Sequence, residues 1–429
     1  MTEDIVLSNQ VPEGWNRYID KSGEEQSVRL ALEVGDLSKL LRKSLGERWR
    51  FNQLSKKIEL DGKPVPVHEL ENLYCHLSER GYKIAKDKAI DAAKAAAMSN
   101  AFHPVKEYLD QIGDDDTIPP ADLERVGTHY WETSDELYNS MIRKALLGAV
   151  KRVYEPGCMF RTCLVFKGPQ DIGKSTGIRI LANPEWLTDT AQDKHEDFLL
   201  AIHSCWIYEL AELDSITSKK EAGALKNNLS SPKDTIRVPY GRSHETFQRS
   251  SIFWGTSNRA DFLRDDTGHS RFWVVELPHD ADTGHVINLA RIREDRDAIW
   301  RAAVLAYRSG EQPVLSAKQQ ADSNRRNRRY EQDHPWEDYI GSWIEDVERD
   351  LPHVEEFTSE QALYMSGAVG QSESANGWGY QYPALKQKDA VEVGRILRRL
   401  GFVQDTNAVR RNGEGRRRYW RRPDTAGTS

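Results

Sequence analysis

One stretch of eight residues constrains the fold of this 429-residue chain more than any other feature. Residues 168–175 have the sequence GPQDIGKS and fit the pattern G-x-x-x-x-G-K-[ST] without adjustment. In such a loop, glycines let backbone amides point at phosphate oxygens, a lysine neutralises the β- and γ-phosphates, and a Ser or Thr hydroxyl reaches Mg²⁺. The pattern requires a buried strand before the loop, predicted at 162–167, and a helix after it. It therefore predicts an α/β domain with a triphosphate-binding loop.

This loop predicts a binding site for two cofactors, ATP and Mg²⁺. Ser175 is the predicted metal ligand of the loop, and Lys174 is also a catalytic candidate because it neutralises charge on the reacting phosphates. Asp171 adds a negative charge beside the phosphates, which is costly unless its side chain points outward. The alternative is a chance glycine-rich turn. The predicted nucleotide contacts are Gly168, Pro169, Gln170, Asp171, Ile172, Gly173, Lys174, Ser175 and Thr176.

Two later strands are predicted to end in polar residues suited to hydrolysis. The segment CWIYELAEL places Glu209 at a strand end and Glu212 one turn later. A carboxylate there holds Mg²⁺ and polarises water, so both are catalytic candidates and Glu209 is a second predicted metal ligand. The strand in SSIFWGTSN ends at Asn258, whose amide would position the attacking water. The competing interpretation, a surface carboxylate, fits Glu212 better than Glu209.

Two arginines are candidates for contact with the nucleotide of a neighbouring subunit. Arg271 lies in RDDTGHSRFW, and Arg249 lies in TFQRSS. A guanidinium that reaches a γ-phosphate in trans stabilises transition-state charge, an effect of about 10³–10⁵ in rate. Such a role requires an oligomer. The alternative for each residue is a local ion pair.

Changes in composition and periodicity divide the chain into five predicted segments. They are a mainly helical N-terminal α+β region (1–115), the nucleotide-binding core (116–315), a charged linker (316–334), a winged-helix-like domain (335–423) and a tail (424–429). Residues 1–20 are expected to be loosely ordered. Helices are predicted at 68–81, 87–102, 135–154, 287–310, 358–369 and 389–402, and strands at 48–54, 56–60, 162–167, 206–210, 235–240, 250–258 and 271–277.

Bulk composition indicates a polar protein of the cytoplasm. The sequence has no apolar run of the ~18 residues needed to span a bilayer, and its four cysteines form no Cys-x-x-Cys pair. A net charge of −7 argues against a generally basic nucleic-acid binder. Residues 395–422, however, hold ten arginines against only Asp405 and Glu414, which predicts an anionic partner for this end of the chain.

The order of motifs resembles the virulence-associated protein E family, helicase-like ATPases of phages and other mobile elements. That family is in turn similar to superfamily 3 helicases of the AAA+ class. The resemblance runs from about residue 50 to 335. It is carried by PVKEYL, ALLGAVKRVYEPG, GPQDIGKST, WIYELAELDSI, LKNNLSSPKDTIRVPYGR, QRSSIFWGTSN, TGHSRFWVVEL and IWRAAVLAYRSGE.

The resemblance implies a P-loop core of AAA+ type and a role for each matching residue. The implied phosphate-loop residues are Gly173, Lys174 and Ser175, the implied acidic motif is Glu209 and Glu212, and the implied polar sensor is Asn258. Two positions depart from the family pattern. Ser270 replaces one of two adjacent arginines, so the finger or sensor role falls on Arg271 alone, and Asp171 replaces a glycine of the phosphate loop.

Two regions are predicted to bind nucleic acid. In related helicases a hairpin before the sensor strand lines a central channel, which here implies Arg237, Tyr240, Arg242 and His244 as DNA contacts. The alternative is that Arg237 and Tyr240 pack locally. The helices and basic hairpin of the last domain resemble a winged helix. Its predicted phosphate contacts are Arg395, Arg398, Arg416, Arg417 and Arg418; the alternative is a solvated face or a subunit contact.

Together these features predict an ATP-dependent, ring-forming DNA helicase or translocase that serves replication of a phage or other mobile element. We expect a homo-oligomer, a hexamer, with single-stranded DNA in its channel, duplex origin DNA on the winged-helix-like domain, and no membrane. No primase domain is evident, so a separate primase is an expected partner. The alternatives are a DNA-binding AAA+ switch or loader, a small-molecule phosphotransferase, and a non-enzymatic DNA binder with a relic nucleotide pocket.

Overall fold

The computed structural model divides the chain into two compact units, Met1–Glu331 and Gln332–Ser429. The residues that it describes are 11–192, 194–211, 213, 219–237, 244–259, 262–263, 269–278, 287–330, 335–350, 355–369, 382–408 and 417–423. Among these residues, no helix combines the length and the apolar character that crossing a membrane requires.

A five-stranded sheet forms the centre of the first unit, which confirms the predicted α/β fold, and the structure shows that this sheet is parallel. The strands are β8 (Cys163–Lys167), β9 (Leu187–Thr188), β10 (Ile207–Leu210), β13 (Ile252–Ser257) and β14 (Phe272–Glu276). Their order across the sheet is β14-β8-β13-β10-β9, and each neighbouring pair is parallel. All strands therefore end at the same side, which we name the carboxyl edge; the opposite side is the amino edge.

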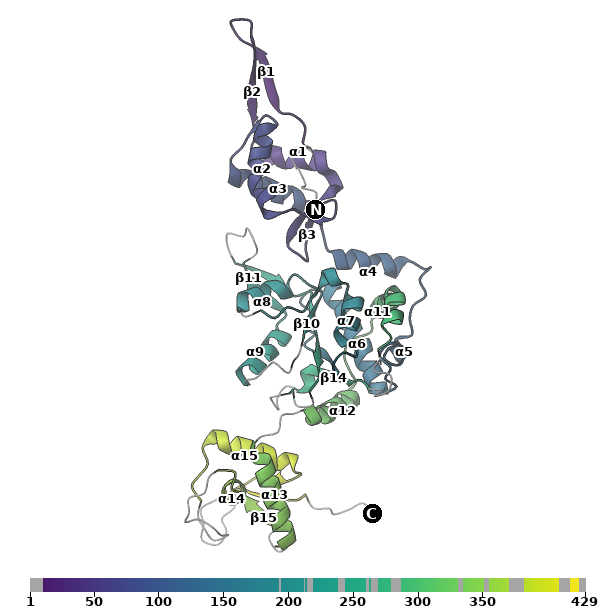
Figure 1. Ribbon diagram of the computed structural model, residues 1–429, viewed down its shortest axis with the longest axis vertical. Helices are drawn as coiled ribbons and strands as arrows, with labels where there is room; N and C mark the ends of the chain where they lie inside the picture. The colour runs from purple at the N-terminus through teal and green to yellow at the C-terminus, as the bar shows by residue number, and fades with distance from the viewer. Residues whose placement is uncertain are drawn as a thin grey trace. The chain divides into compact units, whose positions relative to one another are not determined.

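Helices cover both faces of this sheet (Figure 1). On one face lie α6 (Glu136–Tyr154), α7 (Lys174–Ala182) and α11 (Arg296–Arg308), and on the other lie α8 (His195–Ile202) and α9 (Lys219–Ser230). Alternate residues of β8 enter the two cores. Leu164 and Phe166 pack on the α6 face, while Cys163 and Val165 pack on the α8 and α9 face. This explains the continuous apolar run of β8, which is buried on both sides.

The helix predicted to close this unit differs from the one in the structure. The single helix expected at 287–310 is two helices, α10 (Leu289–Glu294) and α11, separated at Asp295. The Asp295 carboxylate accepts a hydrogen bond from Tyr130 Oη at 2.9 Å, and its backbone leaves the helical conformation.

The predicted charged linker is also a folded element. Residues Ala317–Asn327 form α12, which begins with a capping box between Ser316 and Gln319. Asn327 Nδ2 donates to the Phe272 carbonyl at 2.8 Å, so α12 packs against β14. The Ser-x-x-Gln signal was present in the sequence.

The N-terminal part of the first unit has its own core and two small sheets, β1-β2-β6 and β5-β4-β3-β7. The helices and strands predicted near residues 48–102 are confirmed. They are α2 (Val67–Glu79), α3 (Lys86–Met98), β3 (Trp49–Asn52) and β4 (Lys57–Leu60), joined by α1 (Val34–Leu45), β5 (Lys63–Pro64), β6 (Tyr82–Lys83) and β7 (Ala101–Phe102). A further helix, α4 (Pro104–Asp114), follows this region.

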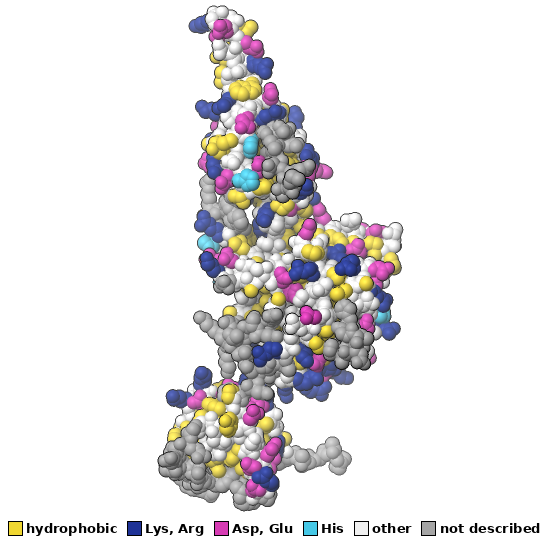
Figure 2. Space-filling view, viewed as in Figure 1, with side chains coloured by type: hydrophobic (Ala, Val, Ile, Leu, Met, Phe, Trp, Pro, Cys, Tyr) yellow, Lys and Arg dark blue, Asp and Glu magenta, His cyan; other side chains and the backbone are white. Residues whose placement is uncertain are grey.

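The expectation that residues 1–20 are loosely ordered is wrong for their second half. Trp15–Ile19 forms β1, which pairs in antiparallel register with β2 (Glu25–Ala31). The turn is fixed because the Asp20 carboxylate accepts from the backbone amides of Ser22 and Glu24. Both strands are largely exposed, and acidic and basic side chains intermingle over this region (Figure 2).

The described part of the second unit contains three helices and a small antiparallel sheet with strand order β15-β17-β16. In chain order its elements are α13 (Pro335–Asp350), β15 (Glu356–Thr358), α14 (Ser359–Met365), α15 (Gln387–Arg399), β16 (Val403–Gln404) and β17 (Tyr419–Arg421). Its core is built around Phe357, Ile396, Leu397 and Trp420. The helices predicted at 358–369 and 389–402 are confirmed, and β16 and β17 are the two strands of the predicted basic hairpin; residues 409–416 between them lie outside the described residues.

Candidate nucleotide-binding site

The loop between β8 and α7 lies at the carboxyl edge of the sheet. Gly173 has φ +90°, a conformation that L-residues with a side chain rarely adopt, and it directly precedes α7. A side chain at Gly168 would place its Cβ 2.9 Å from Ile172 Cδ1, and the Gly168 amide donates to the Ser257 carbonyl at 3.1 Å. The positive φ thus requires glycine at position 173, whereas a side chain at position 168 would only have to displace the end of Ile172; the loop leaves the N-terminus of α7 beside it.

Asp171 does not place its charge in the interior. It adopts φ +64°, in the left-handed region that Asp tolerates better than most residues, and its side chain is exposed. Of the other predicted loop contacts, Gln170 and Thr176 are exposed and Pro169 and Ser175 are half-buried.

The Lys174 ammonium connects the loop to the end of β13. Lys174 is buried, with 7% of its surface exposed. Its Nζ donates to the Gly168 carbonyl at 2.9 Å and to Asn258 Oδ1 at 2.7 Å, and it also contacts the Pro169 carbonyl. The structure therefore brings together the predicted phosphate-loop lysine and the predicted polar sensor.

Glu209 is the most deeply buried carboxylate of this edge. Only 1% of its surface is exposed, and neither carboxylate oxygen has a hydrogen-bond partner among the residues that the structure describes. Burial and the Asp189 carboxylate raise the pKa of Glu209, while the hydroxyls of Ser175 and Thr256 and the Arg179 guanidinium act in the opposite direction. A buried, unpartnered carboxylate is unusual and points to a functional site.

Ser175 and Glu209 fit a Mg²⁺ ion that arrives with a triphosphate. Mg²⁺ is usually held by one or two carboxylates together with phosphate oxygens and water, rather than by a protein cage. The orphaned oxygens of Glu209 supply the carboxylate, and the Ser175 hydroxyl lies close enough to Glu209 to influence its ionisation.

Sequence reasoning missed the surroundings of Glu209. Thr256 lies inside the TSN motif and could have been noticed there. Nothing in the sequence signals that Arg179 or Asp189, which form an ion pair with each other, act on this carboxylate.

Arg271 lies at the amino edge, away from the loop of its own chain. It directly precedes β14, whose first residue pairs with Cys163 at the start of β8. A five-residue strand separates the two edges by about 16 Å. Arg271 is half-buried, and its Nε donates to Ser230 Oγ at 3.0 Å. A role in trans is compatible with this position, whereas a role in its own chain's loop is not.

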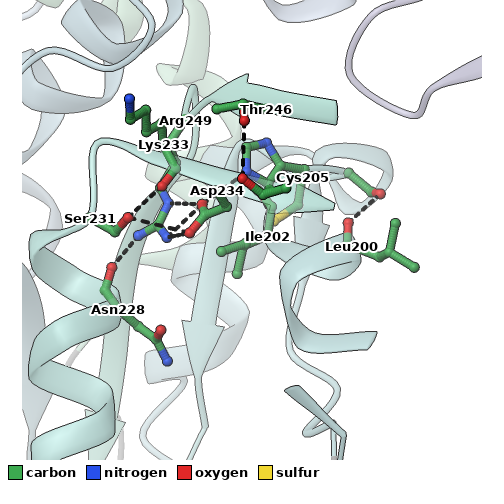
Figure 3. Close-up of polar contacts among 12 residues, drawn as sticks. Leu200, Ile202, Cys205, Asn228, Ser231, Lys233, Asp234, Thr246 and Arg249 are labelled. Atoms are coloured by element: carbon green, nitrogen blue, oxygen red, sulfur yellow. Dashed lines mark hydrogen bonds and ion pairs between the residues drawn. The ribbon is translucent and has the colours of Figure 1, made fainter. Parts of the chain in front are cut away.

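Arg249 needs a correction, because its side chain is only 1% exposed. Its Nη2 lies 2.7 Å from both carboxylate oxygens of Asp234, and its Nε lies 2.9 Å from Oδ2 (Figure 3). The guanidinium cannot extend toward a neighbouring subunit without breaking this buried pair. The expected finger role does not fit, and the local ion pair named as the alternative does.

The predicted DNA-contacting hairpin is present as β11 (Lys233–Ile236) and β12 (Glu245–Gln248), two antiparallel strands. Arg237 and His244 flank its tip and are both exposed. Tyr240 and Arg242 lie outside the described residues, as does the catalytic candidate Glu212.

The arginines of the second unit differ in their availability. Arg398 and Arg418 are exposed and Arg417 is half-buried, while Arg416 lies outside the described residues. Arg395 needs a correction: its side chain is 13% exposed and forms an ion pair with Glu392 at 2.9 Å. Its low exposure and this ion pair make it a poor phosphate contact.

The family assignment follows from residues 118–332, half of the chain, which match the model of the virulence-associated protein E-like domain. The chain belongs to the virulence-associated protein E-like family. The match covers the parallel sheet and the candidate site, and it confirms the family resemblance. No curated protein matches the sequence.

Solved structures of the NrS-1 C-terminal region are distantly similar to this virulence-associated protein E-like chain. One apo structure has a TM-score of 0.46 at 11% identity, with 72% of this chain and 78% of that chain covered. An A-form apo structure has a TM-score of 0.36 at 13% identity, with 56% of this chain and 58% of that chain covered. This chain thus spans less than two thirds of the A-form chain.

Proposed function

We propose that this protein is an ATP-driven, ring-forming DNA helicase or translocase that serves replication of a phage or other mobile element. The observation that carries the proposal is the convergence of Lys174, Glu209 and Asn258 at the carboxyl edge. Ligands of open α/β sheets bind in the crevice outside the carboxyl ends of the strands. Membership of the virulence-associated protein E-like family supports the same proposal.

In this proposal the substrate is ATP bound with Mg²⁺, which spreads the charge of the β- and γ-phosphates when present. Lys174 would leave its loop carbonyls and neutralise the phosphates, while the N-terminus of α7 accepts their charge. Ser175 and Glu209 would hold the metal. Glu209, whose raised pKa suits a base, would take one proton from the attacking water as the water oxygen bonds to the γ-phosphorus and the bond from the γ-phosphorus to the bridging oxygen of ADP breaks. ADP and phosphate leave.

Asn258 would orient the attacking water. In the structure its Oδ1 accepts from Lys174, and arrival of the γ-phosphate would compete for that lysine. Once Lys174 moves to the phosphate, the side-chain amide of Asn258 would be able to bind a water molecule between Glu209 and the phosphate. The same switch would make Asn258 a sensor of the bound nucleotide.

The position of Arg271 at the amino edge supports the proposed ring. Because Arg271 is about a strand length from its own loop, its proposed contact is the γ-phosphate in the next subunit. That contact requires a closed oligomer, for which we propose a hexamer.

Two surfaces are proposed to bind DNA. The β11–β12 hairpin exposes Arg237 and His244, which are suited to single-stranded DNA in the channel. The second unit, with the chain order helix, strand, helix, helix, strand, strand, supports a winged-helix-like module. Its proposed phosphate contacts are Arg398, Arg417 and Arg418. A separate primase would supply primers in the cytoplasm.

The test is hydrolysis of ATP by the full chain with and without single-stranded DNA, followed by unwinding of a forked duplex. We expect hydrolysis that rises with DNA and a shift to a ring when a non-hydrolysable ATP analogue binds. Stimulation without unwinding would identify a switch or loader instead. Phosphate transfer to a small acceptor with no effect of DNA would contradict the proposal.

A further inference from the structure

A cluster of buried charges lies at the base of the β11–β12 hairpin. Asp234 accepts hydrogen bonds from Arg249, and His203 Nε2 lies 2.9 Å from Asp234 Oδ2. The side chains of Asp234, Arg249 and His203 are 8%, 1% and 2% exposed. Burial raises the pKa of the Asp234 carboxyl, but the hydrogen bonds from His203 and Arg249 outweigh it and hold the pKa below its usual value. The carboxylate is therefore ionised and fully engaged.

The three members of this cluster come from three separate parts of the chain. Figure 3 shows Asp234 and Arg249 facing each other beside Asn228. Asp234 lies on β11, Arg249 directly follows β12, and His203 directly follows α8. Arg249 Nη1 also donates to the carbonyl of Asn228, in the last turn of α9. The cluster thus ties both strands of the hairpin to each other and to the ends of two helices.

The backbone of Arg249 adds two more attachments. Its amide donates to the Pro232 carbonyl at 2.9 Å, and its carbonyl accepts from the Gly157 amide at 2.9 Å. A second buried arginine, Arg152, donates to the same carbonyl at 3.2 Å. The base of the hairpin is therefore bound from α6, α8 and α9.

The last turn of α9 connects this cluster to Arg271. Asn228 contacts Arg249, and Ser230, two residues later, contacts Arg271 through Oγ. The last turn of α9 thus binds both Arg249, at the base of the hairpin, and Arg271, at the amino edge.

We propose that Asp234 and Arg249 are positioning residues that fix the hairpin to the last turn of α9, so that the hairpin and Arg271 move as one body. The inference rests on the proposed function, in which the hairpin contacts DNA and Arg271 contacts the neighbouring nucleotide. A two-stranded hairpin is only marginally stable alone, so its direction depends on what holds its base. We call the buried pair of Asp234 and Arg249 the clamp. Separating the two would leave each charge buried without its partner, which is costly, so the clamp holds the hairpin rigidly.

The experiment compares Asp234→Asn with Thr235→Ala in the full chain. Thr235 is the matched control because its hydroxyl only meets Thr246 across the exposed face of the same hairpin, at 3.0 Å. Two quantities are measured: amide hydrogen exchange along the chain, and ATP hydrolysis with and without single-stranded DNA.

For Asp234→Asn we expect exchange in residues 226–236 and 245–249 to accelerate by about tenfold or more beyond any acceleration in residues 163–178, which report only the overall loss of stability. Hydrolysis without DNA should stay within about twofold of wild type, while the increment caused by DNA falls by about tenfold or more. Thr235→Ala should change neither quantity.

A purely structural role would give a different pattern. Exchange that accelerates evenly through α6, β8 and the hairpin, or a DNA increment that survives in a loosened hairpin, would overturn the inference. If Asp234→Asn does not fold, His203→Leu removes one partner of the carboxylate and should give the same pattern at smaller amplitude. A wild-type protein without any DNA increment would overturn the proposed function, and the exchange pattern alone would then decide whether the clamp exists.

Discussion

Glu209 and Asp234 are two carboxylates with buried side chains in the first unit, and their surroundings shift their pKa values in opposite directions. Glu209 at the carboxyl edge is 1% exposed and its oxygens have no hydrogen-bond partner among the described residues. Asp234, beyond the amino edge, has an 8% exposed side chain and is bound by Arg249 and His203. The pKa of Glu209 is raised, chiefly by burial, whereas hydrogen bonds overcome burial and lower the pKa of Asp234. The hydrogen-bonded carboxylate is suited to holding the scaffold, and the carboxylate without a partner among the described residues is the candidate for the proposed chemistry.

The largest expected effect tests the chemical half of this comparison. Glu209→Gln should lower ATP turnover by about 10²–10⁴, the range for loss of a general base, while nucleotide binding persists. Phosphate release and nucleotide affinity are to be measured on the same preparation. The control is Glu196→Gln in the first turn of α8, an exposed carboxylate on the other face of the sheet, which should leave turnover unchanged. Turnover within about threefold of wild type in Glu209→Gln would remove Glu209 from the mechanism.

The structural role of Asp234 is tested by the free energy of unfolding. Asp234→Asn should lower the free energy of unfolding at neutral pH by about 3–5 kcal/mol, the cost of breaking a buried pair by removing one partner. Because the folded-state pKa lies below the ordinary 3.8, the contribution of Asp234 is complete above that value and is lost as pH falls through the folded-state pKa. The gap between wild type and variant, followed by denaturant unfolding, should close in acid. A gap that is independent of pH would contradict the charged pair.

Glu209→Gln should have a stability effect of the opposite sign. Its folded-state pKa lies above the ordinary 4.5, so ionised Glu209 destabilises the folded state at neutral pH. The variant should be more stable than wild type by about 1–3 kcal/mol at pH 8, and the gain should vanish as pH falls below 4.5. Thermal unfolding against pH measures this difference. A variant that is less stable at every pH would show that Glu209 is satisfied after all.

The smallest effect concerns the second unit, where two arginines of α15 form a matched pair. Arg398 is exposed, whereas Arg395 is bound to Glu392. Arg398→Ala should reduce the slope of log affinity for DNA against log salt by about one, whereas Arg395→Ala should leave that slope unchanged. Equal slopes in all three proteins would place the DNA surface elsewhere.

The fold of the first unit could be predicted where local sequence determines structure. Buried parallel strands such as β8 and β13 have nearly continuous apolar sequences, and the glycines of residues 168–175 predict the curled loop that follows β8. Contacts between residues that are distant in the sequence could not be predicted. Nothing local indicates that Arg249 binds Asp234, fifteen positions earlier across the hairpin, and its sequence context left both a finger and a local ion pair open.

Single polar residues account for the remaining errors. Asp295 lies inside a helical pattern, but its bond to Tyr130 divides the helix. The fold of α12 depends on the capping box of Ser316 and on the contact of Asn327 with β14, which charge composition conceals. The predicted segment boundaries, the role of Glu212 and the contacts of Tyr240 and Arg242 stay predictions.

The central claim, that the carboxyl edge binds a triphosphate with Mg²⁺, is tested most directly by calorimetric titration of the full chain with a non-hydrolysable ATP analogue. Wild type should bind saturably and lose affinity when Mg²⁺ is chelated. Lys174→Ala should bind at least about tenfold more weakly, since hydrogen bonds to charged groups contribute about 1.5–3 kcal/mol, while Lys318→Ala, at an exposed lysine of α12, should bind as wild type does. Absence of saturable binding, or equal affinity in Lys174→Ala, would contradict the account.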